Sequence, residues 1–159
     1  MTKTGFRIWT LSLIVLVTMA ASALAQAADS KMTAKAKGRE IIWPAGDYKW
    51  VDAPNAPPGV KQVVLWGDPT KGGRFGAIQK FPAGFSAPLH THSAGLHMVI
   101  MSGTVIHIPE GKPEVRLPAN SYLYDPPGYR HSTKCDAASE CVFFLEGDGK
   151  FDVKMVEKK

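Results

Sequence analysis

Three of the five histidines in this 159-residue chain, His90, His92 and His97, lie within eight residues of one another. On a β-strand, the spacing of His90 and His92 places both imidazoles on one face, about 6–7 Å apart along the chain. Imidazole nitrogen is a good ligand for iron, zinc, nickel, copper and manganese. The pair therefore predicts part of a divalent transition-metal site, which needs further ligands from other segments.

The segments around these histidines are typical of short β-strands. After residue 26, no window of eleven residues free of Gly and Pro shows a helical apolar period. Ser102 and Gly103 are expected to form a tight turn between two paired strands. The expected strands are residues 40–43, 60–66, 76–81, 96–101, 104–108, 114–117, 121–125, 131–135, 140–145 and 151–155. Such a pattern favours an all-β sandwich or barrel.

Two stretches of the chain resemble the motifs of the cupin superfamily. Gly84-Phe-Ser-Ala-Pro-Leu-His90-Thr-His92, followed by Gly103, is similar to the first motif, a Gly, five residues and His-x-His. Pro126-Pro-Gly-Tyr-Arg-His131 is similar to the core of the second motif, although Asn120 and Cys135 replace its outer Gly and Asn. The chain thus resembles a small RmlC-like cupin, similar to the cupin domains of anti-sigma factors.

This resemblance implies an all-β jelly-roll barrel of short antiparallel strands whose metal ligands point inward. His90, His92 and His131 correspond to three histidine ligands of a divalent transition metal (Fe, Zn, Ni, Cu or Mn). The family's usual glutamate ligand is missing, because Leu96 holds its position with His97 beside it. Only one of these neighbours can face inward, so whether His97 is a fourth ligand stays open. The alternative is a cupin that has lost its metal and keeps the histidines as polar core residues.

A site of three histidines without a carboxylate resembles that of cupin oxygenases, including thiol dioxygenases. The resemblance implies a small-molecule ligand or substrate and, if the protein is an enzyme, a metal-dependent oxidoreductase of the dioxygenase type. The alternative is a non-catalytic module that senses a metal or a small ligand. No general base is identifiable, so catalysis stays open. Cupins often pair, which makes a homodimer a further option.

Other polar and aromatic residues lie on the expected strands that follow the histidine motif. His107 matches no motif position and is expected to be a partly buried structural histidine. On the strand 121–125, either Tyr122 and Tyr124 or the set that includes Asp125 should face the cavity, where it would orient a ligand histidine.

The N-terminus has the pattern of a secretory signal peptide. Lys3 and Arg7 precede a short apolar run that ends in two A-x-A sites, Ala23 to Ala25 and Ala25 to Ala27. We therefore expect a cleaved signal peptide at residues 1–25, a flexible tail at 26–38 and a cupin domain at 39–159. The mature protein would be periplasmic or secreted, without membrane attachment.

The cysteines and the charge agree with an exported protein. Cys135 and Cys141 are the only cysteines, and their spacing suits a disulfide across a β-hairpin loop. A thiolate of Cys135 near the metal is the competing interpretation. The formal net charge of +5 is dispersed, largely in the two tails, and no basic stripe alternates with aromatic residues. Nucleic acid is therefore not an expected partner.

Overall fold

The structure, a computed structural model, describes residues 40–54 and 56–157. The expected signal peptide and flexible tail lie outside these described residues. Within them, no helix has the length and apolar character that crossing a membrane requires. Residues 40–43, expected as a strand, form none, and a short 3-10 helix, η1 (Ala45–Asp47), follows Pro44.

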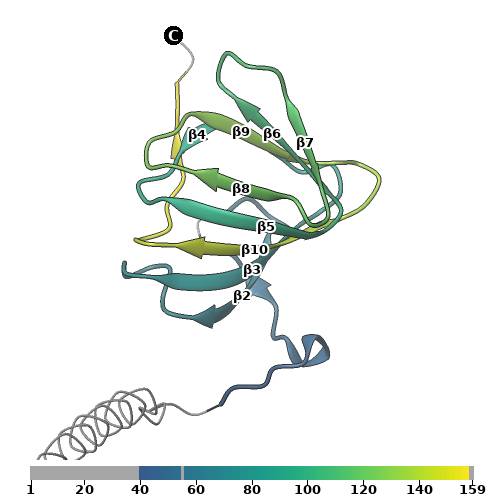
Figure 1. Ribbon diagram of the computed structural model, residues 1–159, viewed down its shortest axis with the longest axis vertical. Helices are drawn as coiled ribbons and strands as arrows, with labels where there is room; N and C mark the ends of the chain where they lie inside the picture. Colours follow the sequence, from purple (N-terminus) through teal and green to yellow (C-terminus); the bar gives the residue numbers. More distant parts are fainter. Residues whose placement is uncertain (1–39, 55, 158–159) are drawn as a thin grey trace, which may run out of the picture. The chain divides into compact units, whose positions relative to one another are not determined.

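The strands form two antiparallel sheets, as predicted for an all-β jelly roll (Figure 1). The six-stranded sheet has the order β1-β2-β3-β10-β5-β8, and the five-stranded sheet has the order β11-β4-β9-β6-β7. The strands are β1 (Val51–Asp52), β2 (Lys61–Trp66), β3 (Phe75–Phe81), β4 (Ser86–Thr91), β5 (Leu96–Ser102), β6 (Thr104–Pro109), β7 (Val115–Pro118), β8 (Tyr122–Asp125), β9 (His131–Cys135), β10 (Cys141–Gly147) and β11 (Lys154–Met155).

The hydrophobic core lies between the two sheets. Along β10, every second residue is buried, beginning with Cys141 and including Phe143 and Leu145. Successive side chains on a strand point to opposite faces, so this alternation turns one face of the sheet toward the core. Phe143 and Ile100 are completely buried, and each contributes about 1.5–3 kcal/mol relative to an exposed side chain.

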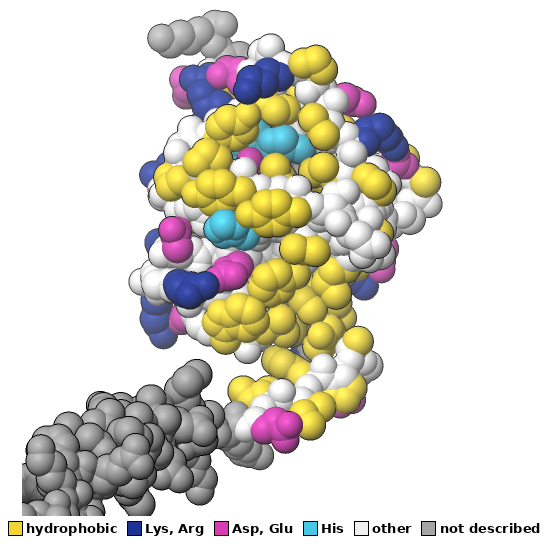
Figure 2. Space-filling model, in the orientation of Figure 1, with side chains coloured by type: hydrophobic (Ala, Val, Ile, Leu, Met, Phe, Trp, Pro, Cys, Tyr) yellow, Lys and Arg dark blue, Asp and Glu magenta, His cyan; other side chains and the backbone are white. Residues whose placement is uncertain are grey.

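The other face of the six-stranded sheet carries exposed hydrophobic side chains. Figure 2 shows hydrophobic side chains gathered on this face of the molecule. Val99 and Met101 on β5 and Tyr122 and Tyr124 on β8 are all exposed. Val99 and Tyr122 are Cα partners in the ladder, so the patch is continuous across the two strands.

The turn at Gly103 does not join paired strands, and this prediction was wrong. β5 lies in the six-stranded sheet and β6 in the five-stranded sheet, so the chain crosses between sheets here. Gly103 has a φ of 75°, and a Cβ at this position would collide with the carbonyl of Glu140. A turn signal in sequence indicates a change of direction but not the sheet in which the next strand finds its partners.

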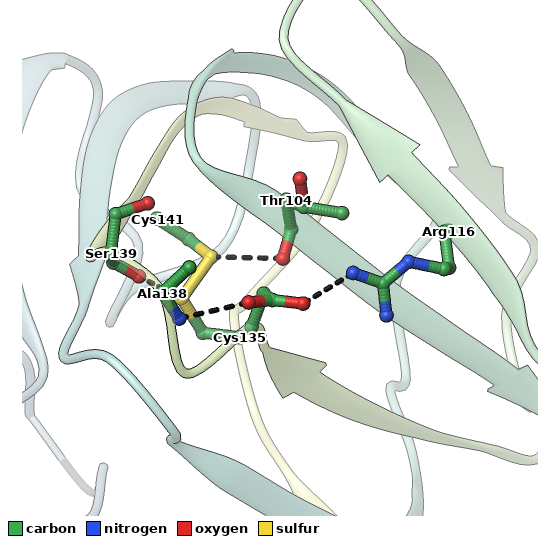
Figure 3. Close-up of a disulfide and its surroundings, with 7 residues drawn as sticks. Thr104, Arg116, Cys135, Ala138, Ser139 and Cys141 are labelled. Carbon is green, nitrogen blue, oxygen red and sulfur yellow. Dashed lines mark hydrogen bonds and ion pairs between the residues drawn. A yellow bond between two sulfur atoms is a disulfide. The ribbon is translucent and has the colours of Figure 1, made fainter.

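Cys135 and Cys141 are joined by a disulfide, with Cα atoms 5.8 Å apart (Figure 3). The expected hairpin is absent, because β9 ends in the five-stranded sheet and β10 begins in the six-stranded one. The disulfide therefore links the two sheets. Cys141 Sγ also lies 3.2 Å from the carbonyl oxygen of Thr104, where β6 begins. Since both sulfurs are bonded, Cys135 provides no free thiolate for a metal.

Candidate metal centre

His90, His92 and His131 come together between the sheets. His90 lies on β4 and is the direct Cα partner of His131 on β9, while His92 follows the end of β4. The ring centroids are 4.3 Å apart for His90 and His131, 4.9 Å for His90 and His92, and 5.4 Å for His92 and His131. All three side chains are buried. The structure thus brings together the three residues that the sequence motifs place at ligand positions.

Each of these imidazoles has one ring nitrogen against a backbone carbonyl. His90 Nδ1 lies 2.7 Å from Pro88 O, His92 Nδ1 lies 2.5 Å from Asp152 O, and His131 Nδ1 lies 3.1 Å from Tyr129 O. A carbonyl oxygen only accepts, so each Nδ1 must carry the hydrogen. Each Nε2 is then unprotonated and keeps its lone pair. One ring nitrogen of each histidine lies within 4.8 Å of a ring nitrogen of the other two. This is the tautomer that a metal ligand requires.

Burial keeps the three imidazoles neutral. Desolvation lowers the pKa of His92 to about 4, and it also lowers the pKa values of His90 and His131. Proximity to the other imidazoles adds to the effect at His90 and His92. At neutral pH the cluster is therefore a set of three uncharged nitrogen donors, which fits a divalent transition metal.

The C-terminal segment completes the pocket around His92, and sequence reasoning missed this role. Besides the Asp152 carbonyl, the Phe151 ring stacks on the His92 ring at 5.5 Å between centroids. The Asp152 carboxylate accepts hydrogen bonds of 2.7 Å from the backbone N–H and the hydroxyl of Ser93. These contacts hold the segment that orients His92.

His97 lies outside this cluster, so the structure does not place it as a fourth ligand. Leu96 faces inward and is 4% exposed, whereas His97 points to the outer face of β5. There His97 Nδ1 lies 2.7 Å from the Tyr122 hydroxyl, and its ring stacks on Tyr124 at 4.5 Å. Strand alternation gives the inward position to only one of the two neighbours.

Two further polar residues reach the cluster. Asp125, on β8, places Oδ2 at 3.6 Å from His131 Nε2 and Oδ1 at 3.6 Å from His107 Nε2. His107, which the sequence indicated only as structural, is 4% exposed and has its ring centroid 4.9 Å from that of His131. His107, Asp125 and His131 form a second candidate ligand group that shares His131 with the first. The inward set on β8 is thus the one with Asp125, and Tyr122 and Tyr124 face outward.

The buried environment of Asp125 disfavours the ionised form of its carboxyl group. Burial raises the pKa of Asp125 to about 6, and desolvation lowers the pKa of His107 to about 4. Within the described residues, Asp125 Oδ1 and His107 Nδ1 are buried without a hydrogen-bond partner. An unsatisfied buried polar group costs about 1–3 kcal/mol, and more when it is charged.

A cavity of about 330 Å³ adjoins the histidine cluster. Its walls are mostly apolar, and its polar lining consists of the three histidines with Asp125, Gln79 and Thr133. Neither Lys nor Arg lines it within the described part of the chain. The apolar walls include Phe81, Phe85, Met98, Phe143, Leu145 and Phe151.

Comparison with known proteins agrees with this geometry. The model of the ChrR cupin-like domain matches residues 39–149. No curated protein matches the sequence significantly. Among solved structures, the chain is similar to the polyketide cyclase RemF from Streptomyces resistomycificus, with 13% identity and a TM-score of 0.63 over 76% of this chain and 88% of that chain.

Two further structures are similar at low identity. KdgF from Halomonas sp. gives 17% identity and a TM-score of 0.56 over 69% of this chain and 94% of that chain. The DMSP lyase DddQ from Ruegeria pomeroyi DSS-3 gives 19% identity and a TM-score of 0.53 over 65% of this chain and 57% of that chain. At these identities the likeness shows the fold alone. Since the family model spans most of the chain and the structure has two antiparallel sheets around the histidine cluster, the chain belongs to the cupin superfamily, as a member of the ChrR cupin-like domain family.

Proposed function

We propose that this cupin binds a divalent transition metal through the Nε2 atoms of His90, His92 and His131. The observation that carries the proposal is the shared tautomer of the three rings. Each ring hydrogen is directed to a backbone carbonyl, which leaves the Nε2 lone pairs of three buried, clustered imidazoles available to a metal. A polar cluster that served only to fill the core would instead need donors for those nitrogens.

The cavity supports a small, largely apolar ligand as the second component of the site. Its volume of about 330 Å³ lies at the small end of ligand pockets. Aromatic walls would bind the apolar body of such a ligand, and its polar donor atom would face the histidines. The absence of Lys and Arg from the described lining disfavours ligands that carry several negative charges.

For the enzymatic function we propose oxidoreductase chemistry of the dioxygenase type on this small molecule. When bound, the metal would supply Lewis-acid or redox chemistry to a ligand in the cavity. The chain's own residues would orient the ligand, hold the imidazoles neutral and exclude water from the site. The alternative is a non-catalytic sensor of a metal or small ligand. Oxygen consumption with a panel of small apolar substrates separates the two, because a sensor binds without consuming oxygen.

Metal analysis of matched histidine variants tests the binding proposal. The wild-type protein should hold about one Fe, Zn, Ni, Cu or Mn per chain, and His131→Ala should lose most of it. His97→Ala is the matched control, because it removes an exposed imidazole on β5 that lies outside the cluster and should keep the metal. Wild-type protein that binds none of these ions at micromolar concentration would contradict the proposal, as would equal loss in both variants.

We also propose that the protein is exported to the periplasm or secreted. The disulfide between Cys135 and Cys141 supports this location, because disulfides persist in oxidising compartments. The residue pattern before Ala25 supports it independently. Mass spectrometry of the protein from its own cells should find Gln26 as the first residue. An intact N-terminus in the cytoplasm would contradict the proposal.

A further inference from the structure

Asp125 lies opposite the position that lacks the family's carboxylate. Strand β8 is antiparallel to β5, and Asp125 is the Cα partner of Leu96. Directly paired residues place their side chains on the same face, with Cβ atoms about 4.5–5.5 Å apart. Leu96 and Asp125 are each 4% exposed, so both point between the sheets. A carboxylate on β8 therefore reaches the region where a glutamate at position 96 would lie.

The carboxylate of Asp125 faces one histidine of the cluster, His131, and also His107. Its Oδ2 is 3.6 Å from His131 Nε2, the atom that is left unprotonated by the hydrogen bond of Nδ1 to Tyr129 O. Two donor atoms bound to one zinc-like ion at about 2.1 Å each are about 3–3.6 Å apart. The other oxygen, Oδ1, faces His107 Nε2 at 3.6 Å and has no hydrogen-bond partner among the described residues.

We propose that Asp125 supplies the carboxylate of the metal centre, in place of the one that β5 lacks because it carries Leu96. The proposal rests on metal binding by His90, His92 and His131. Three neutral imidazoles leave the two positive charges of a divalent ion uncompensated in a mostly apolar cavity. A buried carboxylate is stable only beside a cation or when it is hydrogen-bonded, and the described residues place no Lys or Arg in this lining. Asp125 and the ion therefore compensate each other.

Cobalt titration of matched variants tests this role without any assay of activity. Asp125→Asn keeps the shape of the side chain and removes its charge. It should lower the affinity for Co²⁺ at least about tenfold and shift the visible absorption bands of the bound ion. Asp52→Asn removes an exposed carboxylate on β1 and should change neither the affinity nor the bands.

A second variant tests whether the two strand positions are equivalent. In the Asp125→Asn background, Leu96→Glu returns a carboxylate from the facing strand and should recover most of the affinity. Circular dichroism and thermal unfolding without metal verify that each variant is folded. A folded double variant that recovers none of the affinity would contradict the proposed equivalence of the positions.

The outcomes separate this proposal from the one on which it rests. If His92→Ala abolishes Co²⁺ binding while Asp125→Asn matches the wild type in affinity and spectrum, Asp125 is not a ligand and the three-histidine site stands. If the wild type binds no metal, both proposals fail. A zinc-loaded crystal of the wild type needs no variant: the zinc should lie about 2.0–2.2 Å from a carboxylate oxygen of Asp125. A zinc ion beyond about 3 Å from both oxygens would overturn the proposal.

Discussion

At the scale of the residue, the site depends on backbone carbonyls that select one tautomer. The Nδ1–H groups of His90, His92 and His131 are directed to the carbonyls of Pro88, Asp152 and Tyr129. Two of these carbonyls lie two residues before their histidine, so local chain geometry sets them. The carbonyl of Asp152 comes from the C-terminal segment, and only the folded chain brings it to His92.

Buried neutral histidines make the metal-free protein sensitive to acid. The pKa values of His92 and His107 are lowered from 6.5 to about 4 by burial. Between about pH 6.5 and pH 4 the unfolded chain binds more protons than the folded chain. The free energy of unfolding therefore falls as the pH falls through this range. At pH 5, each such histidine lowers the free energy of unfolding by about 2 kcal/mol relative to its value well above pH 6.5. Asp125, whose pKa is raised to about 6, acts in the opposite direction but is a single group.

We therefore expect the chelator-treated protein to have a lower urea midpoint at pH 5 than at pH 7. His107→Gln removes one of the titrating groups and should reduce the loss between the two pH values. An identical pH dependence in the wild type and this variant would show that His107 does not contribute. A midpoint that rises on acidification would show that Asp125 outweighs the histidines.

At the scale of the element, the chain crosses between the sheets at Gly103, between two strands that line the region of the site. The turn ends β5, which carries Leu96, and begins β6, which carries His107. The backbone of Glu140 packs against Gly103, next to the disulfide that also links the two sheets. The turn and the disulfide are thus two of several covalent connections between the sheets that enclose the cavity.

Alanine at this glycine should destabilise the fold more than at a similar glycine in open space. Gly103 and Gly111 have φ values of 75° and 71°, but a Cβ would meet the Glu140 carbonyl only at Gly103. Gly111→Ala should cost about 1–2 kcal/mol for the left-handed backbone conformation. Gly103→Ala should cost a further 1–3 kcal/mol, roughly, for the collision. Urea unfolding measures both, and equal losses would contradict the importance of the close contact.

At the scale of the whole molecule, we propose that the exposed hydrophobic patch on the six-stranded sheet is the interface of the homodimer that the resemblance to cupins suggests. Val99, Met101, Tyr122 and Tyr124 form this patch on the face opposite the core. Hydrophobic patches that remain exposed are typical of interaction surfaces. A second copy of the chain that packed there would cover the patch without obstructing the cavity between the sheets.

Charge placed in this patch should separate the copies. Val99→Glu is expected to shift the sedimentation coefficient from a dimer to a monomer, because pairing would bury an uncompensated carboxylate. Val115→Glu, at an exposed residue on β7 in the other sheet, is the matched control and should leave the dimer intact. A wild-type protein that sediments as a monomer at tens of micromolar would contradict the proposal.

The sequence by itself was sufficient for the fold class and for selecting three histidines that the fold brings together. Alternation, turn residues and the motif spacing are local properties, so they predicted β5 and β9 to within a residue and the partners His90, His92 and His131. They also indicated that Leu96 and His97 compete for one inward position, and the structure assigns it to Leu96.

Only the tertiary structure decided which strands are neighbours, because pairing depends on contacts between segments that are distant in sequence. In the structure, β5 and β6 lie in different sheets, and the disulfide expected within a hairpin links the two sheets instead. The fold also brings the carbonyl of Asp152 to His92. It also paired Asp125 with Leu96, which supplies a carboxylate where the local motif contains none. Local spacing reveals which residues share a face of one strand, whereas the ladder register determines which residues of other strands complete the site.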